Sequence, residues 1–272
     1  MSRAAPLPRR PPACLHLGMA VAERGREPDL LHALAGLEHR DAGARELMDD
    51  PGADPLALDR TYHRFGIVNR IVSRPAAVYE EWVRPRLATT HTARLLDIGA
   101  GGGDLPREIL RHAERDGLRL EVVAIDPDER AIRYAARHEG PRFRARVATT
   151  ADLVAEGETF DVVWSNHVLH HMTPAELGAL LADTERLVAP GGIGVHGDIE
   201  RSRGAYLGFW AATLPFAWNA LAGSFIRPDG LTSIRRSHTA PELAAAVPHG
   251  WRVKRGFPSR LELVWGSEIP DD

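Results

Sequence analysis

The stretch LLDIGAGGGDLP, residues 95–106, places four glycines within five positions directly behind an apolar run that carries an acid. Glycine has no Cβ, so it allows positive φ angles and lets a ligand come close to the backbone. An apolar strand followed by such a turn and then by a helix directs backbone N–H groups and a helix N-terminus into one crevice. The stretch therefore predicts a ligand site at the end of a strand in an α/β sheet.

Apolar runs and amphipathic segments alternate along the chain after about residue 90. We expect strands at 93–99, 118–126, 142–148, 160–166 and 193–199, and helices at 105–117, 127–140 and 174–192. The last helix has Thr173 at its N-cap and Glu176 at its third position, which predicts a capping box. Strands that alternate with helices in this way predict a doubly wound, mostly parallel sheet with its ligand at the carboxyl ends of the strands.

The amino-acid composition limits which classes of protein this chain can belong to. With 272 residues, 44% of them hydrophobic, the chain can bury a full core. The net charge is −3, and the cations are arginines scattered along the chain, with Lys254 as the only lysine. We predict no nucleic-acid partner, because such a partner requires a clustered basic stripe. The single cysteine, Cys14, cannot form an internal disulfide, which indicates a cytoplasmic location.

The chain divides into three predicted parts. We expect a disordered leader at 1–28, a helical lid at 29–90, and a ligand-binding domain at 91–272 with a helical insert at about 203–235. Arg9 and Arg10 admit a twin-arginine export signal, but prolines follow them directly and His16 interrupts the apolar segment. Translation that starts at Met19 would explain the leader equally well.

The glycine pattern departs from the dinucleotide-binding fingerprint G-x-G-x-x-G. Gly99, Gly101 and Gly103 alternate, and Asp104 stands where the third glycine of that fingerprint belongs. Pyrophosphate would meet a carboxylate there, which argues against a nicotinamide cofactor. Asp97 precedes the turn and is expected to point into the same crevice, where its negative charge suits a ligand that carries an amine or a sulfonium.

LLDIGAGGGD resembles motif I of the class I S-adenosylmethionine-dependent methyltransferases, whose core is acid-x-G-x-G-x-G. The resemblance extends over about residues 60–266, with further motifs in VVAIDPDERAI, TTADLVAEG, WSNHVLHHM and ERLVAPGGIGVHGD. It implies a Rossmann-like, mostly parallel sheet of seven strands, completed by an antiparallel hairpin at 251–257 and 260–266 and covered by an N-terminal helical lid.

The resemblance also implies S-adenosylmethionine as the cofactor. Asp126 would accept hydrogen bonds from both ribose hydroxyls, and Asp152 would accept one from the adenine amino group. The implied cofactor site consists of Asp97, Gly99, Ala100, Gly101, Gly103, Asp126, Pro127, Asp152, Leu153, Asn166 and His167. Simpler explanations stay open, since Asp126 could only cap the next helix and Asp152 could be an ordinary loop residue.

Three histidines follow the expected fourth strand in NHVLHH, residues 166–171. Methyl transfer to a phenol, enol or alcohol requires a base, and histidine titrates near neutral pH. The same place in the ubiquinone-pathway O-methyltransferases carries E-x-x-E-H, which His167-x-x-His170-His171 resembles with both acids replaced. We predict His171, and next His170, as the general base, although either could only hydrogen-bond the loop. We expect no metal: imidazoles argue against Mg²⁺, while paired histidines could hold another ion.

The acceptor site is expected to be apolar and to come from several segments. Phe65, Asn69 and Ser73 have the spacing of the Y-x-x-x-N-x-x-x-S helix of the ubiquinone and menaquinone C-methyltransferases. This similarity indicates helices that cover the cofactor. His196 and Asp198 end the fifth strand and could face the same space. The predicted acceptor-binding residues are Phe65, Asn69, His196, Trp210 and Phe216.

The insert contains an uncharged run, residues 205–226, that is long enough to span a bilayer. Spanning would leave the expected hairpin at 251–266 on the wrong side of the membrane. Pro215 and Asn219 favour a broken helix pair over a pocket instead. With its aromatic residues, this run predicts either an acceptor site or a surface in peripheral contact with lipid.

Together these features predict a methyltransferase that acts on a small apolar phenol or quinol, at oxygen or at an activated ring carbon, in quinone biosynthesis or secondary metabolism. N-methylation of a small amine is an alternative, since a free amine hardly needs a base. A second alternative is a cofactor-binding partner protein without transfer activity. The sequence does not distinguish oxygen from carbon as the acceptor atom, and it leaves the oligomeric state open.

Overall fold

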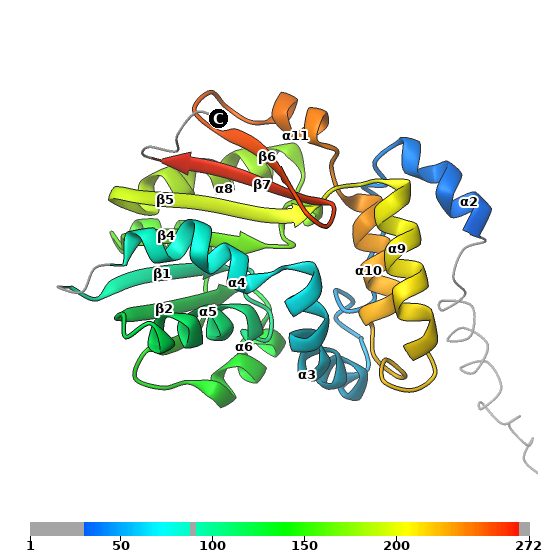
Figure 1. Cartoon of the computed structure of the whole chain (residues 1–272), viewed down its shortest axis with the longest axis horizontal. Coiled ribbons are helices and arrows are strands. Elements are labelled where there is room, and N and C mark those ends of the chain that lie inside the picture. Colours follow the sequence, from blue (N-terminus) through cyan, green and yellow to red (C-terminus); the bar gives the residue numbers. More distant parts are fainter. Residues whose placement is uncertain (1–29, 88–90, 267–272) are drawn as a thin grey trace, which may run out of the picture.

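A computed structural model describes residues 30–87 and 91–266, and the predicted leader and Cys14 lie outside these ranges. Its core is a seven-stranded sheet in the order β3-β2-β1-β4-β5-β7-β6 (Figure 1). The strands are β1 Ala93–Ile98, β2 Leu120–Asp126, β3 Phe143–Val147, β4 Phe160–Asn166, β5 Val188–Ile199, β6 Arg252–Gly256 and β7 Arg260–Gly266. β1 to β5 pair in parallel, and β7 pairs antiparallel with β5 and β6. The predicted doubly wound sheet with an antiparallel hairpin is confirmed.

Helices cover both faces of the sheet and its carboxyl edge. They are α2 Leu30–Ala35, α3 Pro55–Val72, α4 Pro75–Val78, α5 Asp104–Arg115, α6 Glu129–Ala135, α7 Thr150–Ala155, α8 Pro174–Leu187, α9 Arg203–Thr213, α10 Ile226–Arg236 and α11 Ala240–Ala246. The predicted capping box of α8 is present, because the Thr173 hydroxyl accepts from the backbone N–H of Glu176 and the Glu176 carboxylate accepts in return.

Two apolar cores hold the helices on the sheet. Along β1, Leu95 packs in one core with Ile109 of α5, and Leu96 packs in the other with Leu181 of α8. All four side chains are fully buried. Because successive side chains of a strand point to opposite faces, a strand between two helical layers must be apolar at every position. This requirement explains the continuous apolar runs of the sequence.

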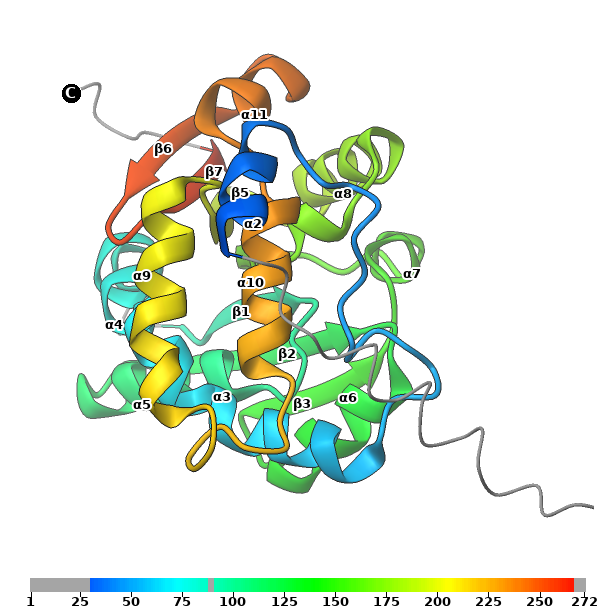
Figure 2. The ribbon, with the colours of Figure 1, turned by 90° about the vertical axis from the view of Figure 1, so that its right-hand side faces the viewer.

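α3, α9 and α10 lie beyond the carboxyl ends of the parallel strands (Figures 1 and 2). The uncharged run is broken as expected: α9 ends at Thr213, a short 3₁₀ turn covers Leu214–Phe216, and α10 begins at Ile226. α9 packs on α10 through Tyr206 and Leu231, which are buried together. Among the described residues, none of the helices combines the length and the apolar character needed to cross a bilayer.

Candidate active site

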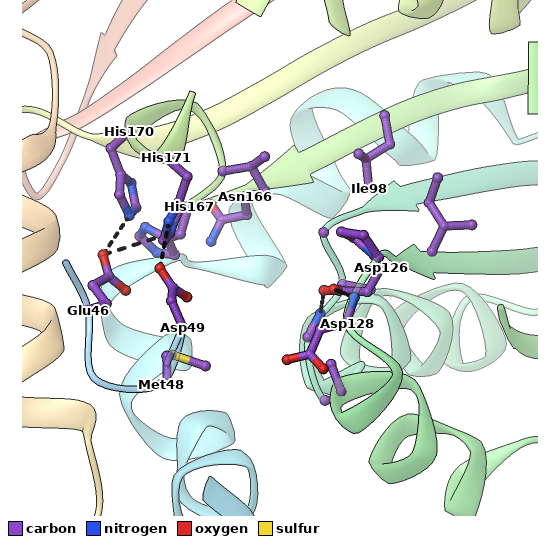
Figure 3. A pocket seen from close by; sticks show the side chains of 18 of the residues that line it. Glu46, Met48, Asp49, Ile98, Asp126, Asp128, Asn166, His167, His170 and His171 are labelled. Carbon is purple, nitrogen blue, oxygen red and sulfur yellow. Dashed lines mark hydrogen bonds and ion pairs between the residues drawn. The ribbon is translucent and has the colours of Figure 1, made fainter. Parts of the chain in front are cut away.

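One cavity of about 1200 Å³ opens where β1, β2 and β4 end. The glycine-rich turn and Asp126 form one wall, and the three histidines with the loop Glu46–Asp49 form the opposite wall (Figure 3). α3 and α10 close the remaining sides. The rule that ligands of open α/β sheets bind at the carboxyl ends of the strands therefore places a ligand here.

The glycines of the turn serve two different purposes. Gly101 has φ +54°, and a Cβ added to it would meet no atom within 4 Å, because the backbone faces open cavity. Gly103 has φ +70°, and a Cβ there would lie 2.9 Å from the ring of Phe143. Gly101 thus leaves room for a ligand at the backbone, whereas Gly103, which does not line the cavity, permits the turn to pack on the sheet.

Asp126 ends β2 and faces the cavity beside the glycine-rich turn (Figure 3). Its Oδ2 accepts the backbone N–H of Gly101 at 3.0 Å, and its Oδ1 accepts that of Asp128 at 2.8 Å. Burial raises the pKa of Asp126, and these two N–H donors oppose that rise. The carboxylate is therefore held in one orientation, with its second lone pairs available to a ligand that carries hydroxyl groups. Asp128 caps α6, so the capping role proposed for Asp126 belongs to its neighbour.

Besides Gly103, three of the predicted cofactor residues do not line the cavity. Asp97 is 3% exposed beneath the turn, and burial together with the charges of Asp104 and Asp126 holds its pKa well above the usual range. Asp97 therefore does not contact a ligand in the cavity directly, contrary to the prediction. Asp152 is exposed and accepts from Thr149 in the capping box of α7, which explains an acid at this position without any ligand.

Leu153, the third of these residues, is fully buried in the core. In its place, Thr149, Thr150 and Ala151 line the cavity at the start of α7. Of the predicted cofactor residues, the cavity is lined by Gly99, Ala100, Gly101, Asp126, Pro127, Asn166 and His167.

His170 is buried between two carboxylates. Its Nδ1 lies 2.8 Å from Oδ1 of Asp198, and its Nε2 lies 3.2 Å from Oε1 of Glu46 (Figure 3). Burial disfavours the charged ring, but the two carboxylates raise the pKa of His170 to about 10. Burial alone would raise the pKa of Glu46, whereas the hydrogen bond and charge of His170 lower it to about 2. Both ring nitrogens are occupied, so this ring has no free lone pair with which to accept a proton.

His171 differs from its neighbour in exposure and partners. Its side chain is 32% exposed on the cavity, and its ring lies against that of His170 with centroids 4.2 Å apart. Nδ1 lies 3.2 Å from Oδ2 of Asp49, and Nε2 lies 3.7 Å from Oε1 of Glu46 (Figure 3). A carboxylate that accepts the Nδ1 proton fixes the tautomer and leaves Nε2 able to act as a base.

The loop that carries Glu46 and Asp49 is fastened to α10. The carboxylate of Asp229 accepts the backbone N–H groups of Leu47 at 2.7 Å and Met48 at 3.0 Å, and the hydroxyl of Ser233 donates to Glu46 at 2.8 Å. Burial raises the pKa of Asp229 to about 7. The lid and the insert, which are far apart in the sequence, thus meet at the histidine wall.

His167 and Asn166 belong to a second network, at the start of the histidine segment. Nε2 of His167 lies 3.0 Å from the hydroxyl of Ser73, and the amide of Asn166 donates to the same hydroxyl at 3.0 Å. Arg260 donates to the amide oxygen of Asn166 at 3.1 Å. Asn69, one helical turn before Ser73, donates to Asp104 at 3.0 Å. Asn69 and Ser73 therefore tie α3 to the start of α5 and to the end of β4, as a covering helix requires.

Glu46, His170 and His171 are also the only described residues grouped closely enough to hold a metal ion, with one ligand atom from each lying within 4.8 Å of the others. The hydrogen bonds offer a different explanation of this grouping. A protonated His170 between the carboxylates of Asp198 and Glu46 satisfies these three side chains without a metal. Our prediction of a site without metal therefore stays a prediction, and a chelation experiment described below tests it.

Two of the five predicted acceptor residues, Phe65 and Asn69, line the cavity. His196 does not, because its ring is fully buried between the hydroxyls of Ser165 at 2.8 Å and Thr184 at 3.1 Å. We correct its assignment from acceptor contact to packing beneath the sheet. Trp210 lies under the guanidinium of Arg227 and away from the cavity lining.

Phe216, the last of the five, is 49% exposed on the outside of the insert and does not line the cavity. From the insert, the cavity takes Phe209, Ile226 and Gly230 instead. The sequence did not predict a role for Glu46, Asp49 or Asp229 in the site. The only signal for the first two was an acidic cluster, ELMDD, which by itself is typical of a solvated surface.

Residues 95–192 match a family model described as a methyltransferase domain. A ubiquinone biosynthesis O-methyltransferase of Mesorhizobium japonicum is 32% identical over 203 residues, which cover 70% of this chain and 78% of that protein. A protein of the same name from a Caulobacter species is 34% identical over 151 residues, which cover 51% of this chain and 55% of that protein. The chain thus spans about half the length of this second relative.

Among solved structures, the plantazolicin methyltransferase BpumL, in complex with a triazolic desmethylPZN analog and SAH, superposes with a TM-score of 0.51. The two sequences are 13% identical, and the superposition covers 86% of this chain and 96% of the BpumL chain. Identity at this level supports the fold alone. The ligands of that complex are those of that protein.

Proposed function

The chain belongs to the S-adenosylmethionine-dependent methyltransferases, and on this premise we propose that it methylates a small, largely apolar phenol or quinol at oxygen or at an activated ring carbon. The observation that carries the proposal is the continuity of one cavity from Gly101 and Asp126 to His171. Its volume of about 1200 Å³ exceeds the range of roughly 300–1,000 Å³ that is usual for one small ligand. A cofactor and an acceptor therefore have room to lie in it together.

The first wall suits the cofactor. The carboxylate of Asp126 is oriented to accept two hydroxyl groups of a ribose, and the missing Cβ of Gly101 leaves space for the nucleoside at the backbone. When bound, S-adenosylmethionine supplies an activated methyl group on a sulfonium. Asn166 and His167 line the cavity at the end of β4, next to β1, so we propose both as cofactor contacts.

The second wall suits removal of a proton from the acceptor. We assign this role to Nε2 of His171, because Asp49 lies at Nδ1 and the ring reaches the cavity. His170 is assigned as a positioning residue: its ring packs against that of His171 and holds Glu46 in place. The proton leaves the phenol or quinol hydroxyl for Nε2, and the resulting phenolate is the nucleophile at oxygen or at the ring carbon that it activates.

The remaining lining indicates the polarity of the acceptor. Phe65, Val68, Phe209 and Ile226 present apolar surface to the cavity. The relatives named as ubiquinone biosynthesis O-methyltransferases support a quinol-type acceptor. We propose the cytoplasm as the compartment, since the single cysteine suits a reducing environment.

Incubation with methyl-labelled S-adenosylmethionine and a panel of phenols, quinols and amines, followed by mass spectrometry, tests the proposal. We expect the label on a phenol or quinol. Transfer only to amines, with full activity in a His171→Gln variant, would replace the proposal with N-methylation. Binding of the cofactor without transfer to any member of the panel would favour a protein that binds the cofactor and does not turn it over.

A further inference from the structure

Large apolar side chains are exposed on the outer side of the insert, away from the cavity. The turn after α9 carries Phe216, which is 49% exposed, and Trp218, which is 78% exposed. From residue 204 to residue 226 the chain has no charged side chain. Arg203, the first residue of α9, is exposed and pairs with Glu38. The exposed residues of α9 after it are uncharged: Gly204, Leu207, Gly208, Ala211 and Ala212. Apolar surface of this kind on a protein that has already buried its cores indicates an interaction site.

α3 extends this surface along its outward stripe. Ile67 and Ile71 are each 70% exposed, and Arg60 and Arg64 lie on the same side of the helix, one to two turns earlier. The opposite side of α3, which includes Phe65 and Asn69, lines the cavity. The helix is therefore apolar on two sides, and packing inside the protein explains only the inner one.

The two arginines join α3 to the insert. Arg64 donates to the carbonyl of Ala222 at 2.7 Å, and a Cβ at Gly223 would lie 2.7 Å from the guanidinium of Arg60. The turn after α9 thus lies beside the outward stripe of α3, as both views of the ribbon show (Figures 1 and 2). Phe216, Trp218, Ile67 and Ile71 consequently belong to one surface, which we name the insert face, with the two arginines between its apolar parts.

The charges of the insert face have one sign. No carboxylate of the described residues pairs with Arg60 or Arg64. Asp59, the nearest acid of α3, pairs with Arg137 of α6 at 2.8 Å and lies on another side of the helix. A partner for the face must therefore offer apolar depth for two aromatic rings and negative charge beside it. Anionic lipid headgroups above acyl chains offer both, and tryptophan and arginine favour that interface.

We propose that the insert face docks the protein on the surface of an anionic lipid bilayer, with Phe216 and Trp218 inserted at headgroup depth and Arg60 and Arg64 against lipid phosphates. The contact is peripheral, because the described helices do not span a bilayer. The cavity lies directly behind α3 and α10, so docking would bring an apolar acceptor dissolved in the bilayer next to the site. Only this last consequence rests on the proposed function.

Co-sedimentation of the full chain with vesicles tests the docking without cofactor or acceptor. We expect binding to vesicles of phosphatidylcholine mixed with phosphatidylglycerol and little binding to phosphatidylcholine alone, with the difference reduced at high salt. The affinity of the double variant Phe216→Ser/Trp218→Ser for these vesicles should fall at least about tenfold, because the burial of two large side chains is lost. Arg60→Gln and Arg64→Gln should each reduce binding about fivefold.

Matched variants separate docking from general changes of charge or polarity. Arg115→Gln on α5 removes one positive charge away from the insert face, as each arginine variant does on it, and Val147→Asp changes an exposed apolar residue of β3. Both should bind vesicles as the unmodified protein does. Brominated lipids should quench tryptophan fluorescence in the unmodified protein and lose most of this effect in Trp218→Phe, whose circular dichroism should be unchanged.

Three outcomes would overturn the proposal. Absence of vesicle binding would do so, as would binding that the insert-face variants leave unchanged. A dimer in analytical ultracentrifugation that Phe216→Ser/Trp218→Ser abolishes, without vesicle binding, would show that a second copy covers the face instead. Methyl transfer to a water-soluble phenol should be the same in these variants and in the unmodified protein, so failure of the docking and failure of the proposed function are measured separately.

Discussion

On the wall that carries Gly101 and Asp126, the partners are 25 residues apart and sit at the ends of neighbouring parallel strands. On the wall that carries Glu46 and His170, the partners are 124 residues apart, and one of them lies in an irregular loop. The first wall follows from sheet topology. The second depends on a lid and an insert that meet only after folding, so variants of the two walls should separate cofactor binding from proton removal.

The largest expected effect on the second wall comes from His171→Gln. Loss of a general base costs about 10²–10⁴-fold in rate, so we expect kcat for a phenol to fall within that range. The dissociation constant of S-adenosylhomocysteine should stay within about threefold, because the first wall is unchanged. Steady-state kinetics and calorimetry on one preparation measure both quantities.

His249→Gln is the matched control for this variant. His249 is exposed and does not line the cavity, so both quantities should equal those of the unmodified protein. A His171→Gln enzyme with full kcat on a phenol would remove His171 from the mechanism.

A smaller effect is expected from Asp49→Asn. The amide keeps the size of the side chain but cannot hold the Nδ1 proton of His171 as a carboxylate does, so kcat should fall about tenfold. The acidic limb of the kcat profile against pH, where the general base becomes protonated, should also shift, which a merely structural change would not produce. Asp50 lies one residue away, and its carboxylate accepts the backbone N–H of Gly52. The control variant Asp50→Asn should therefore leave the pH profile unchanged. Equal profiles for the two variants would contradict the positioning role of Asp49.

The buried ion pair of the second wall predicts a dependence of stability on pH. The folded pKa of His170 is raised to about 10, from an unfolded value of about 6.5. The stabilisation is therefore complete below about pH 6.5 and is lost as the pH rises through about 10. Urea unfolding of the unmodified protein and of His170→Gln should show a difference in unfolding free energy that shrinks from pH 6 to pH 10. A difference that is constant with pH would exclude an imidazolium between Asp198 and Glu46.

The smallest expected effect is that of metal removal. If protonation of His170 satisfies the cluster, dialysis against EDTA should leave the melting temperature and the binding of S-adenosylhomocysteine unchanged. Elemental analysis should find no stoichiometric transition metal. One zinc or iron ion per chain, lost together with thermal stability on chelation, would show that Glu46, His170 and His171 hold a metal.

The first wall could be predicted from the sequence because its determinants are local. The alternation of apolar strands and helices gives the strand ends, and the ends of parallel strands meet at one edge. That reasoning placed Gly101 at this edge, the resemblance to the methyltransferases added Asp126, and both residues line the cavity. The resemblance placed Asp152 there too, but this acid accepts hydrogen bonds from the hydroxyl and N–H of Thr149, a local partner that the motif does not reveal.

The second wall could not be predicted for two physical reasons. α9 is apolar on every side, so periodicity could not decide that Phe209 rather than Trp210 faces the cavity. β5 is buried on both faces, so alternation could not show that His196 points toward Thr184 beneath the sheet. The contact between Glu46 and His170 has no sequence spacing at all, since it depends on how Asp229 fastens the lid loop to α10.

The central claim is that the cavity binds a sulfonium nucleoside with its ribose on Asp126. Calorimetric titration with S-adenosylhomocysteine tests it most directly, on the unmodified protein, on Asp126→Ala, and on Glu121→Ala, which removes an exposed acid at the far end of the same strand. We predict one site per chain, affinity weakened about 100-fold or more in Asp126→Ala by the loss of two charge-assisted hydrogen bonds, and no change in Glu121→Ala. No heat of binding in the folded, unmodified protein, or equal affinity in all three proteins, would contradict the account.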